Sequence, residues 1–188
     1  MNCCHYYQFI PGNEQVFSAD VTRVRYGCGV LKELGQEARA LGIKRAAVYT
    51  DSRIRSSPLF EEAVAALRAE GIEAVIYDEV RVEPTDTSFK EAAQFAKSSA
   101  FDGFISIGGG SVIDTVKAAN LYSSCEGDFM DYVNAPIGRG LVAPGPLRPH
   151  LACPTTAGTG SESTGIAVFD LLEMKSKTGI SSRALLPD

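Results

Sequence analysis

A glycine-rich turn between a predicted strand and a predicted helix is the segment of this sequence best suited to chemistry. Four small residues follow the apolar run Phe104–Ile107 and open a helical pattern: Gly108, Gly109, Gly110 and Ser111. The first N–H groups of a helix have no intrahelical partner, and the helix dipole favours an anion there. Glycines would let a phosphate approach the backbone closely, although they would also suit a tight turn with positive φ angles. We favour a phosphate site.

Two polar side chains of this segment could contribute to binding. Ser111 could cap the helix and could also donate a hydrogen bond to a phosphate. Asp114 lies in the first helical turn, where it suits the helix dipole but would repel a phosphate. We therefore expect Asp114 to accept a hydrogen bond from a hydroxyl group of a ribose or of a substrate.

Asp51 is the next candidate, because it ends the apolar run Arg45–Thr50. Ligands of a parallel sheet bind outside the carboxyl ends of its strands. A carboxylate there could accept both hydroxyls of an adenosine ribose and would repel a 2′-phosphate. The alternative role of Asp51 is the N-cap of the following helix. A weaker glycine loop, Gly27–Gly29, precedes Asp51 by roughly the spacing of a dinucleotide motif, but Lys32 replaces the motif's third glycine.

A second loop, Cys153–Glu162, is rich in hydroxyl groups and glycine. It is either a flexible turn or a set of short donors for phosphate and ribose oxygens, supplied by Thr155, Thr156, Thr159 and Ser161. Lys177 could add a positive charge near a nucleotide, although by itself it is typical of a surface lysine.

No nucleophile and base pair stands out in the sequence. The two histidines, His5 and His150, have no metal-ligand spacing, so we expect surface or loop roles for both. Cys3, Cys4 and His5 are adjacent near the start of the sequence, which does not favour a metal site. Oxidation of an alcohol requires a group that polarises its oxygen, commonly a metal or a histidine, and none is evident.

The elements that must position these residues alternate between helix and strand. Helical spacing and end signals such as Ser57, Gly71 and a cap among Thr85–Thr87 predict helices over Val30–Leu41, Pro58–Glu70, Ser88–Ser99 and Val112–Tyr122. Strands are predicted at Arg45–Thr50, Ile72–Tyr77, Phe101–Ile107, His150–Cys153, Gly165–Phe169 and Lys177–Ile180. Gln15–Tyr26 predicts an edge hairpin, and Asn134–His150 predicts a long loop. The alternation indicates an α/β fold: a Rossmann-like parallel sheet flanked by helices.

Composition narrows the functional class. The chain has 188 residues, of which 45% are hydrophobic, and a net charge of -5. This charge argues against nucleic-acid partners, and no apolar run is long enough for a membrane span. Five scattered cysteines favour reduced thiols over a disulfide framework. The first residues resemble neither a secretory nor an Arg-rich mitochondrial leader, so we expect a cytoplasmic protein.

The motifs Gly108–Asp114 and Thr155–Glu162, with the strand-ending Asp51, together resemble the iron-dependent (group III) alcohol dehydrogenase family. The resemblance extends over essentially all 188 residues. It is strongest to the hydroxyacid-oxoacid transhydrogenase branch, through Asp114–Tyr122, Asp131–Gly138 and Gly179–Ala184.

The resemblance implies an N-terminal dinucleotide-binding domain, a C-terminal all-helical domain and an active site between them. It implies that Gly109, Gly110 and Ser111 hold a pyrophosphate, and that Asp51 favours NAD over NADP. It places the remaining candidates around the riboses, phosphates and nicotinamide of the cofactor: Asp114, Thr155, Thr156, Thr159, Ser161, Val168 and Lys177. Thr85–Asp86 departs from the family's frequent Asn-Pro.

The family's iron is held by one Asp and three His of the helical domain, and we expect those positions to lie beyond Asp188. Residues 1–188 would then form one dinucleotide-binding domain, with Fe²⁺ present only in a complete family member and little activity in this chain alone. The full-length protein would act on a small alcohol or a hydroxy acid. Two alternatives are a stand-alone NAD-binding module and a zinc protein similar to glycerol dehydrogenase or dehydroquinate synthase. An exposed domain face would favour a homodimer or a larger assembly.

Overall fold

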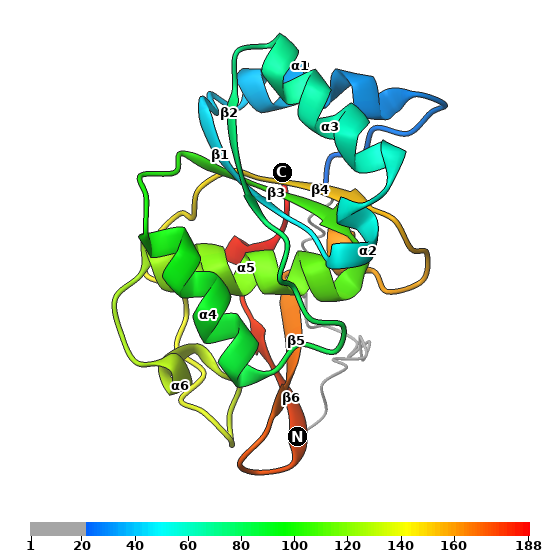
Figure 1. Ribbon diagram of the computed structural model, residues 1–188. Helices are drawn as coiled ribbons and strands as arrows, with labels where there is room; N and C mark the ends of the chain where they lie inside the picture. Colours follow the sequence, from blue (N-terminus) through cyan, green and yellow to red (C-terminus); the bar gives the residue numbers. More distant parts are fainter. Residues whose placement is uncertain (1–21) are drawn as a thin grey trace, which may run out of the picture.

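The computed structural model describes residues 22–188 and has the predicted α/β fold (Figure 1). Four parallel strands form one sheet in the order β2-β1-β3-β4. In this sheet Ala47 of β1 lies opposite Val75 of β2 and Phe104 of β3. The strands are β1 (Arg45–Tyr49), β2 (Glu73–Tyr77), β3 (Gly103–Gly108) and β4 (His150–Pro154).

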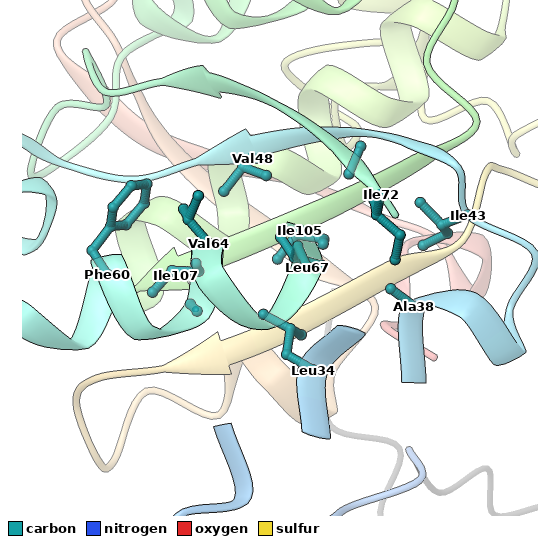
Figure 2. Close-up of a cluster of buried hydrophobic side chains, with 12 residues drawn as sticks. Leu34, Ala38, Ile43, Val48, Phe60, Val64, Leu67, Ile72, Ile105 and Ile107 are labelled. Carbon is teal, nitrogen blue, oxygen red and sulfur yellow. The ribbon is translucent and has the colours of Figure 1, made fainter. Parts of the chain in front are cut away.

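Helices cover both faces of this sheet because alternate residues of the buried strands face opposite sides. On one face, Ala46 and Val48 pack with α1 (Leu34–Ala40), which follows a 3₁₀ turn at Val30–Glu33, and with α3 (Pro58–Ala69). This cluster includes Phe60, Leu67 and Ile105 (Figure 2). On the other face, Ala47 and Tyr49 pack with α4 (Asp86–Lys97) and α5 (Gly110–Ser124).

Local signals fix the ends of the helices as predicted. The Ser57 side chain accepts a hydrogen bond from the Phe60 N–H, and Pro58 occupies the first turn of α3. Gly71, just past the end of α3, has a φ of 73°, which favours glycine. Among the three candidates for the α4 cap, Thr85 is the residue that accepts from the Ser88 N–H.

Helix α5 is surrounded by protein on all sides. Eleven consecutive residues, Val112–Tyr122, are buried. The antiparallel pair β5 (Ile166–Leu171) and β6 (Ser176–Ser181) packs against α5 on the side away from the sheet (Figure 1). No face of α5 is exposed to water along this stretch, so each polar side chain within it needs a protein or ligand partner.

The short elements differ from expectation. The helix α2 (Ser52–Arg55), the helix α6 (Phe129–Tyr132) and the 3₁₀ turns at Ser161–Ser163 and Arg183–Leu185 were not predicted, because three or four residues carry no periodic pattern. The expected hairpin at Gln15–Tyr26 lies largely outside the described residues, and positions 22–26 form no strand. Positions 134–149 form the long loop that was predicted. Within residues 22–188 no helix combines the length and apolar character that crossing a membrane requires.

Candidate functional site

The candidate residues gather where the order of the strands reverses. From β1 the chain passes to β2 on one side and then returns to β3 on the other side of β1. The crevice outside the carboxyl ends of such strands is where α/β proteins bind ligands. Asp51 follows β1, Gly109 follows β3, and Thr155 follows β4. These ends are joined directly, since Thr50 Oγ1 donates to the Ile107 carbonyl at 2.8 Å and the Thr155 N–H donates to the Gly108 carbonyl at 2.9 Å.

The glycine turn provides space rather than unusual backbone angles. Gly109 is the N-cap of α5 with φ -77° and ψ -174°, and Gly108 and Gly110 have no positive φ either. A Cβ atom added at Gly109 would lie 3.1 Å from Thr156 Oγ1, and one at Gly110 would lie 3.0 Å from three atoms of Thr159. The alternative of a tight turn with positive φ is therefore wrong. These glycines let the threonine-rich loop approach the start of the helix.

The start of α5 offers two backbone donors. The N–H groups of Val112 and Ile113 both donate to the Gly109 carbonyl. Among residues 22–188, no acceptor faces the N–H of Gly110 or of Ser111. Two unpaired N–H groups at the positive end of a fifteen-residue helix are the donors that a phosphate group would use.

Ser111 does not cap the helix, so that prediction is wrong. The helix begins before Ser111 because Gly109 is already extended and Gly110 already helical. Instead, Ser111 Oγ accepts a hydrogen bond from the Glu83 N–H at 3.2 Å. The hydroxyl hydrogen of Ser111 has no acceptor within the described part of the chain, which leaves it for a ligand.

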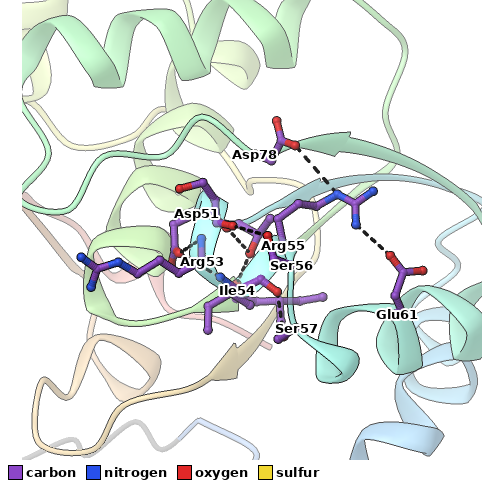
Figure 3. A network of polar contacts seen from close by, with 11 residues as sticks. Asp51, Arg53, Ile54, Arg55, Ser56, Ser57, Glu61 and Asp78 are labelled. Carbon is purple, nitrogen blue, oxygen red and sulfur yellow. Dashed lines mark hydrogen bonds and ion pairs between the residues drawn. The ribbon is translucent and has the colours of Figure 1, made fainter.

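Asp51 is the N-cap of α2, which was one of its two predicted roles. Its Oδ1 atom accepts from the N–H groups of Arg53 at 2.9 Å and Ile54 at 3.0 Å (Figure 3). No described residue bonds to the second carboxylate oxygen, Oδ2. Beside it, Arg55 forms ion pairs with Glu61 at 2.8 Å and Asp78 at 3.8 Å. Oδ1 caps the helix, so Oδ2 could accept a hydrogen bond from a ribose. This contact stays a prediction.

Asp114 is buried, with 7% of its surface exposed. Its Oδ2 atom accepts from the Val168 N–H of β5 at 3.0 Å. Its Oδ1 atom lies 3.8 Å from Lys117 Nζ and has no hydrogen-bond partner among the described residues. Burial raises the pKa of this carboxyl, while the Val168 bond and the Lys117 charge oppose the rise. Because this oxygen is buried, the hydroxyl contact expected of Asp114 stays a prediction.

The threonine-rich loop, residues 155–161, lies against the glycine turn, with Thr156 beside Gly109 and Thr159 beside Gly110. Thr155, Thr156 and Thr159 are exposed, whereas Ser161 is buried where the loop returns to the protein. Gly158 and Gly160 have φ angles of 99° and 70°, which permit the reversal of the chain.

Lys117 was not identified from the sequence as part of the site. Its side chain is 0% exposed, and its ammonium group donates to the carbonyls of Ser161 at 2.6 Å, Thr164 at 2.6 Å and Ile166 at 2.8 Å. Burial lowers its pKa to about 8, against the opposing charges of Asp114 and Glu162. The available signal was a lysine one turn after Asp114, inside a helical run whose other residues are uncharged.

The two β5–β6 candidates are arranged differently from each other. Val168 is partly exposed and is held by the Asp114 bond described above. Lys177 lies opposite Asp170 in the strand pair, and its ammonium is 3.5 Å from an Asp170 carboxylate oxygen. The Lys177 side chain is 58% exposed, so this surface pair stabilises the fold little and leaves its cofactor contact a prediction.

His150 is not a surface or loop residue, so that prediction is wrong. It starts β4 with 3% of its surface exposed, and its Nε2 atom lies 2.9 Å from Ser106 Oγ. Burial, and secondarily the charge of Lys117, lowers its pKa to about 3. His150 is the first residue of β4, so it lies near the amino-terminal ends of the strands. Gly109 and the candidate site lie beyond their carboxyl ends.

The other sequence candidates do not form sites. Gly29 starts the first 3₁₀ turn, and no strand precedes Gly27 in the described part of the chain, so this loop lacks the strand-turn-helix context of a dinucleotide motif. Cys3, Cys4 and His5 lie outside the described residues. Residues 22–188 hold no group of three His, Cys, Asp or Glu side chains that could bind a metal ion.

Curated relatives match nearly the whole chain. The hydroxyacid-oxoacid transhydrogenase of Bos taurus is 50% identical over 191 aligned positions, which cover 97% of this chain and 41% of the relative. The human protein of the same name is 47% identical, with the same coverage. The chain thus spans about two fifths of the length of these relatives.

These relatives also correct the expected location. Their names describe them as mitochondrial, so the expectation of a cytoplasmic protein is wrong. That expectation rested partly on cysteine usage, which separates oxidising from reducing compartments but does not separate one reducing compartment from another.

Solved structures and a family model give the same assignment. A 1,3-propanediol oxidoreductase structure superposes with a TM-score of 0.82 at 31% identity, covering 92% of this chain and 44% of that chain. The NADH-dependent butanol dehydrogenase A of Thermotoga maritima superposes with a TM-score of 0.83 at 28% identity, covering 93% and 43%. The sequence model of the iron-containing alcohol dehydrogenases matches residues 21–188. This chain therefore belongs to the iron-containing alcohol dehydrogenase family.

Proposed function

We propose that this chain binds NAD as the dinucleotide-binding part of an oxidoreductase. The observation that carries the proposal is the pair of unpaired N–H groups at Gly110 and Ser111, placed at the reversal of strand order beneath the threonine-rich loop. The relatives support the class of reaction, because they are named transhydrogenases and one structural neighbour is named NADH-dependent.

The described residues fit the dinucleotide. Gly109 and Gly110 place no side chain between the start of α5 and the threonine-rich loop, so the Gly110 and Ser111 N–H groups would hold a pyrophosphate beside that loop. Asp51 would accept a hydrogen bond from the adenosine ribose, and Asp114 is proposed as a further cofactor contact. The other cofactor contacts in this proposal come from Gly108, Thr155, Thr156, Thr159, Ser161, Val168 and Lys177. When bound, nicotinamide supplies the acceptor or donor of a hydride exchanged with an alcohol or a 4-hydroxy acid.

The described residues do not fit the iron that the family name implies. No group of three metal-binding side chains exists within residues 22–188, so no step of the reaction is assigned to a metal here. We propose that this chain has little dehydrogenase activity by itself. The exposed apolar side chains of Ile166, Leu172 and Met174 on and beside β5 support an assembly with a second chain.

Titration calorimetry tests this proposal directly. NAD and ADP-ribose are expected to bind the 188-residue chain with one site each, while hydride transfer from 4-hydroxybutyrate or 1-propanol stays at the level of the blank even with added Fe²⁺. Absence of binding by both nucleotides from folded protein would contradict the NAD proposal. Metal-dependent turnover by the chain would contradict the proposed inactivity alone.

Asp51→Ser separates the ribose role of Asp51 from its capping role. Serine caps helices about as well as aspartate, so α2 should be retained, but serine has no charge to repel a 2′-phosphate. We expect the preference for NAD over NADP, measured as the ratio of dissociation constants, to fall by about 10-fold or more, the factor that corresponds to roughly 1.4 kcal/mol. Arg53→Ser serves as the control, because it changes the charge of an exposed neighbouring residue and leaves the Asp51 side chain to cap α2. An unchanged ratio in Asp51→Ser would limit Asp51 to capping.

A further inference from the structure

Lys117 is a charged side chain in the buried stretch of α5, and its three hydrogen bonds all lead to residues 161–166, from the end of the threonine-rich loop to the start of β5. An ammonium group has three N–H donors and no acceptor. Here each donor has a backbone carbonyl, those of Ser161, Thr164 and Ile166, at 2.6 to 2.8 Å. The side chain is fully buried, so these bonds are made without competition from water.

The three carbonyls belong to one short segment, residues 161–166, which joins the loop to β5. The segment consists of a three-residue 3₁₀ turn and the start of a strand, and neither element directs its carbonyl groups to a helix by itself. One turn earlier on α5, Asp114 accepts from the Val168 N–H. Two oppositely charged side chains of α5 therefore hold the carbonyl and N–H groups of the same stretch of backbone.

The same helix also begins at the glycine turn. Gly110 is its first residue and faces Thr159, and Lys117 lies two turns further on. The position of the loop over the turn is consequently set by the distance along α5 between its N-terminus and Lys117. A rigid spacer of this kind fixes the hydroxyl groups of the loop relative to the Gly110 and Ser111 N–H groups.

We propose that Lys117 is a positioning residue for the cofactor: it holds the threonine-rich loop over the glycine turn at the distance that a pyrophosphate requires. The proposal rests on the proposed binding of NAD. Lys117 itself has no donor left for a ligand, so it acts through the loop and does not contact the cofactor.

Comparison of NAD with AMP tests the proposal in Lys117→Met, which keeps the length of the side chain and removes its donors. NAD spans the Asp51 side and the loop, whereas AMP offers only the adenosine half. We expect the dissociation constant of NAD to rise at least about 10-fold, and that of AMP to change less than about 3-fold. The matched control is Val116→Ala, which removes buried side-chain volume from the sheet-facing side of the same helix. Val116→Ala should lower thermal stability and leave unchanged the ratio of the NAD dissociation constant to the AMP dissociation constant.

The outcomes separate a positioning role from a purely structural one. A parallel loss of NAD and AMP binding, or an equal change of the ratio in Val116→Ala, would overturn the proposal. If Lys117→Met does not fold, Lys117→Arg decides, because a planar guanidinium cannot direct its donors to three carbonyls around one nitrogen. The ratio of the NAD dissociation constant to the AMP dissociation constant should then rise several-fold, and an unchanged ratio would overturn the proposal.

Amide hydrogen exchange provides a readout that does not depend on NAD. In the ligand-free chain, the amides of residues 159–166 should exchange at least about 10-fold faster in Lys117→Met or Lys117→Arg than in the unmodified protein, while those of β1 stay protected. Unchanged exchange of the loop would overturn the inference. Faster exchange of the loop in a chain that binds no NAD would reject the proposed function and retain the anchoring of the loop.

Discussion

Gly110→Val is expected to weaken the binding of NAD about 100-fold, because losing one or two hydrogen bonds to a charged phosphate costs roughly 1.5–3 kcal/mol each. A Cβ atom at Gly110 would already lie 3.0 Å from the Cβ, Cγ2 and Oγ1 atoms of Thr159. The two further methyl groups of valine would project into the space proposed for the pyrophosphate. Thr159 is exposed, so the valine is accommodated by displacing the Thr159 side chain toward solvent.

The fold itself should tolerate this change. Gly110 has no positive φ, and valine is no worse than glycine in a helix. Far-ultraviolet circular dichroism should therefore be unchanged, and calorimetry measures the loss of NAD binding. The control is Gly145→Val, at a glycine with no atom within 4 Å of its added Cβ and no positive φ. Equal affinity of Gly110→Val and Gly145→Val for NAD would place the pyrophosphate elsewhere.

Acid is expected to destabilise the protein through His150. Its pKa is about 3 in the folded protein against an ordinary value of 6.5, because the imidazole is buried. Between these two values the unfolded chain takes up a proton that the folded chain does not. The free energy of unfolding therefore falls as the pH drops below 6.5, by up to about 1.4 kcal/mol per pH unit. Above pH 6.5 neither state takes up the proton, so His150 causes no loss of stability there.

His150→Gln should remove this dependence while keeping a polar partner for Ser106. Urea unfolding at pH 7.5 and pH 5.0 measures the effect: the unmodified protein should lose about 2 kcal/mol more than His150→Gln over this interval. Ser106→Ala is the control, because it removes the hydroxyl partner at 2.9 Å and keeps the imidazole buried. Parallel losses in the unmodified protein and His150→Gln would show that the acid sensitivity comes from other groups.

The features that the sequence predicted correctly depend on neighbouring residues. The caps at Ser57 and Thr85 and the glycine after α3 are interactions within a few residues, so their signals are contained in the sequence. The parallel sheet followed from the alternation of elements, since each buried strand is a continuous apolar run. The position of the glycine turn between β3 and α5 followed for the same reason.

The features that it missed depend on contacts between distant residues. Lys117 finds its three carbonyls 44, 47 and 49 residues further along the chain. His150 is buried against Ser106, 44 residues away. The sequence near the start of β4 does not show whether that strand start is buried or exposed. The glycines of the turn were identified, but their use as space for Thr156 and Thr159 was visible only when the loop was in place.

The burial of α5 on every side has a thermodynamic consequence. A surface helix can fray while the rest of a domain stays folded, but α5 is the common support of the sheet, the hairpin and the loop. The donors at Gly110 and the anchor at Lys117 thus belong to the same cooperative unit as the hydrophobic core. The nucleotide pocket and the core should disappear in one thermal transition, so that a bound ligand raises the melting temperature of the entire domain and not that of a local segment.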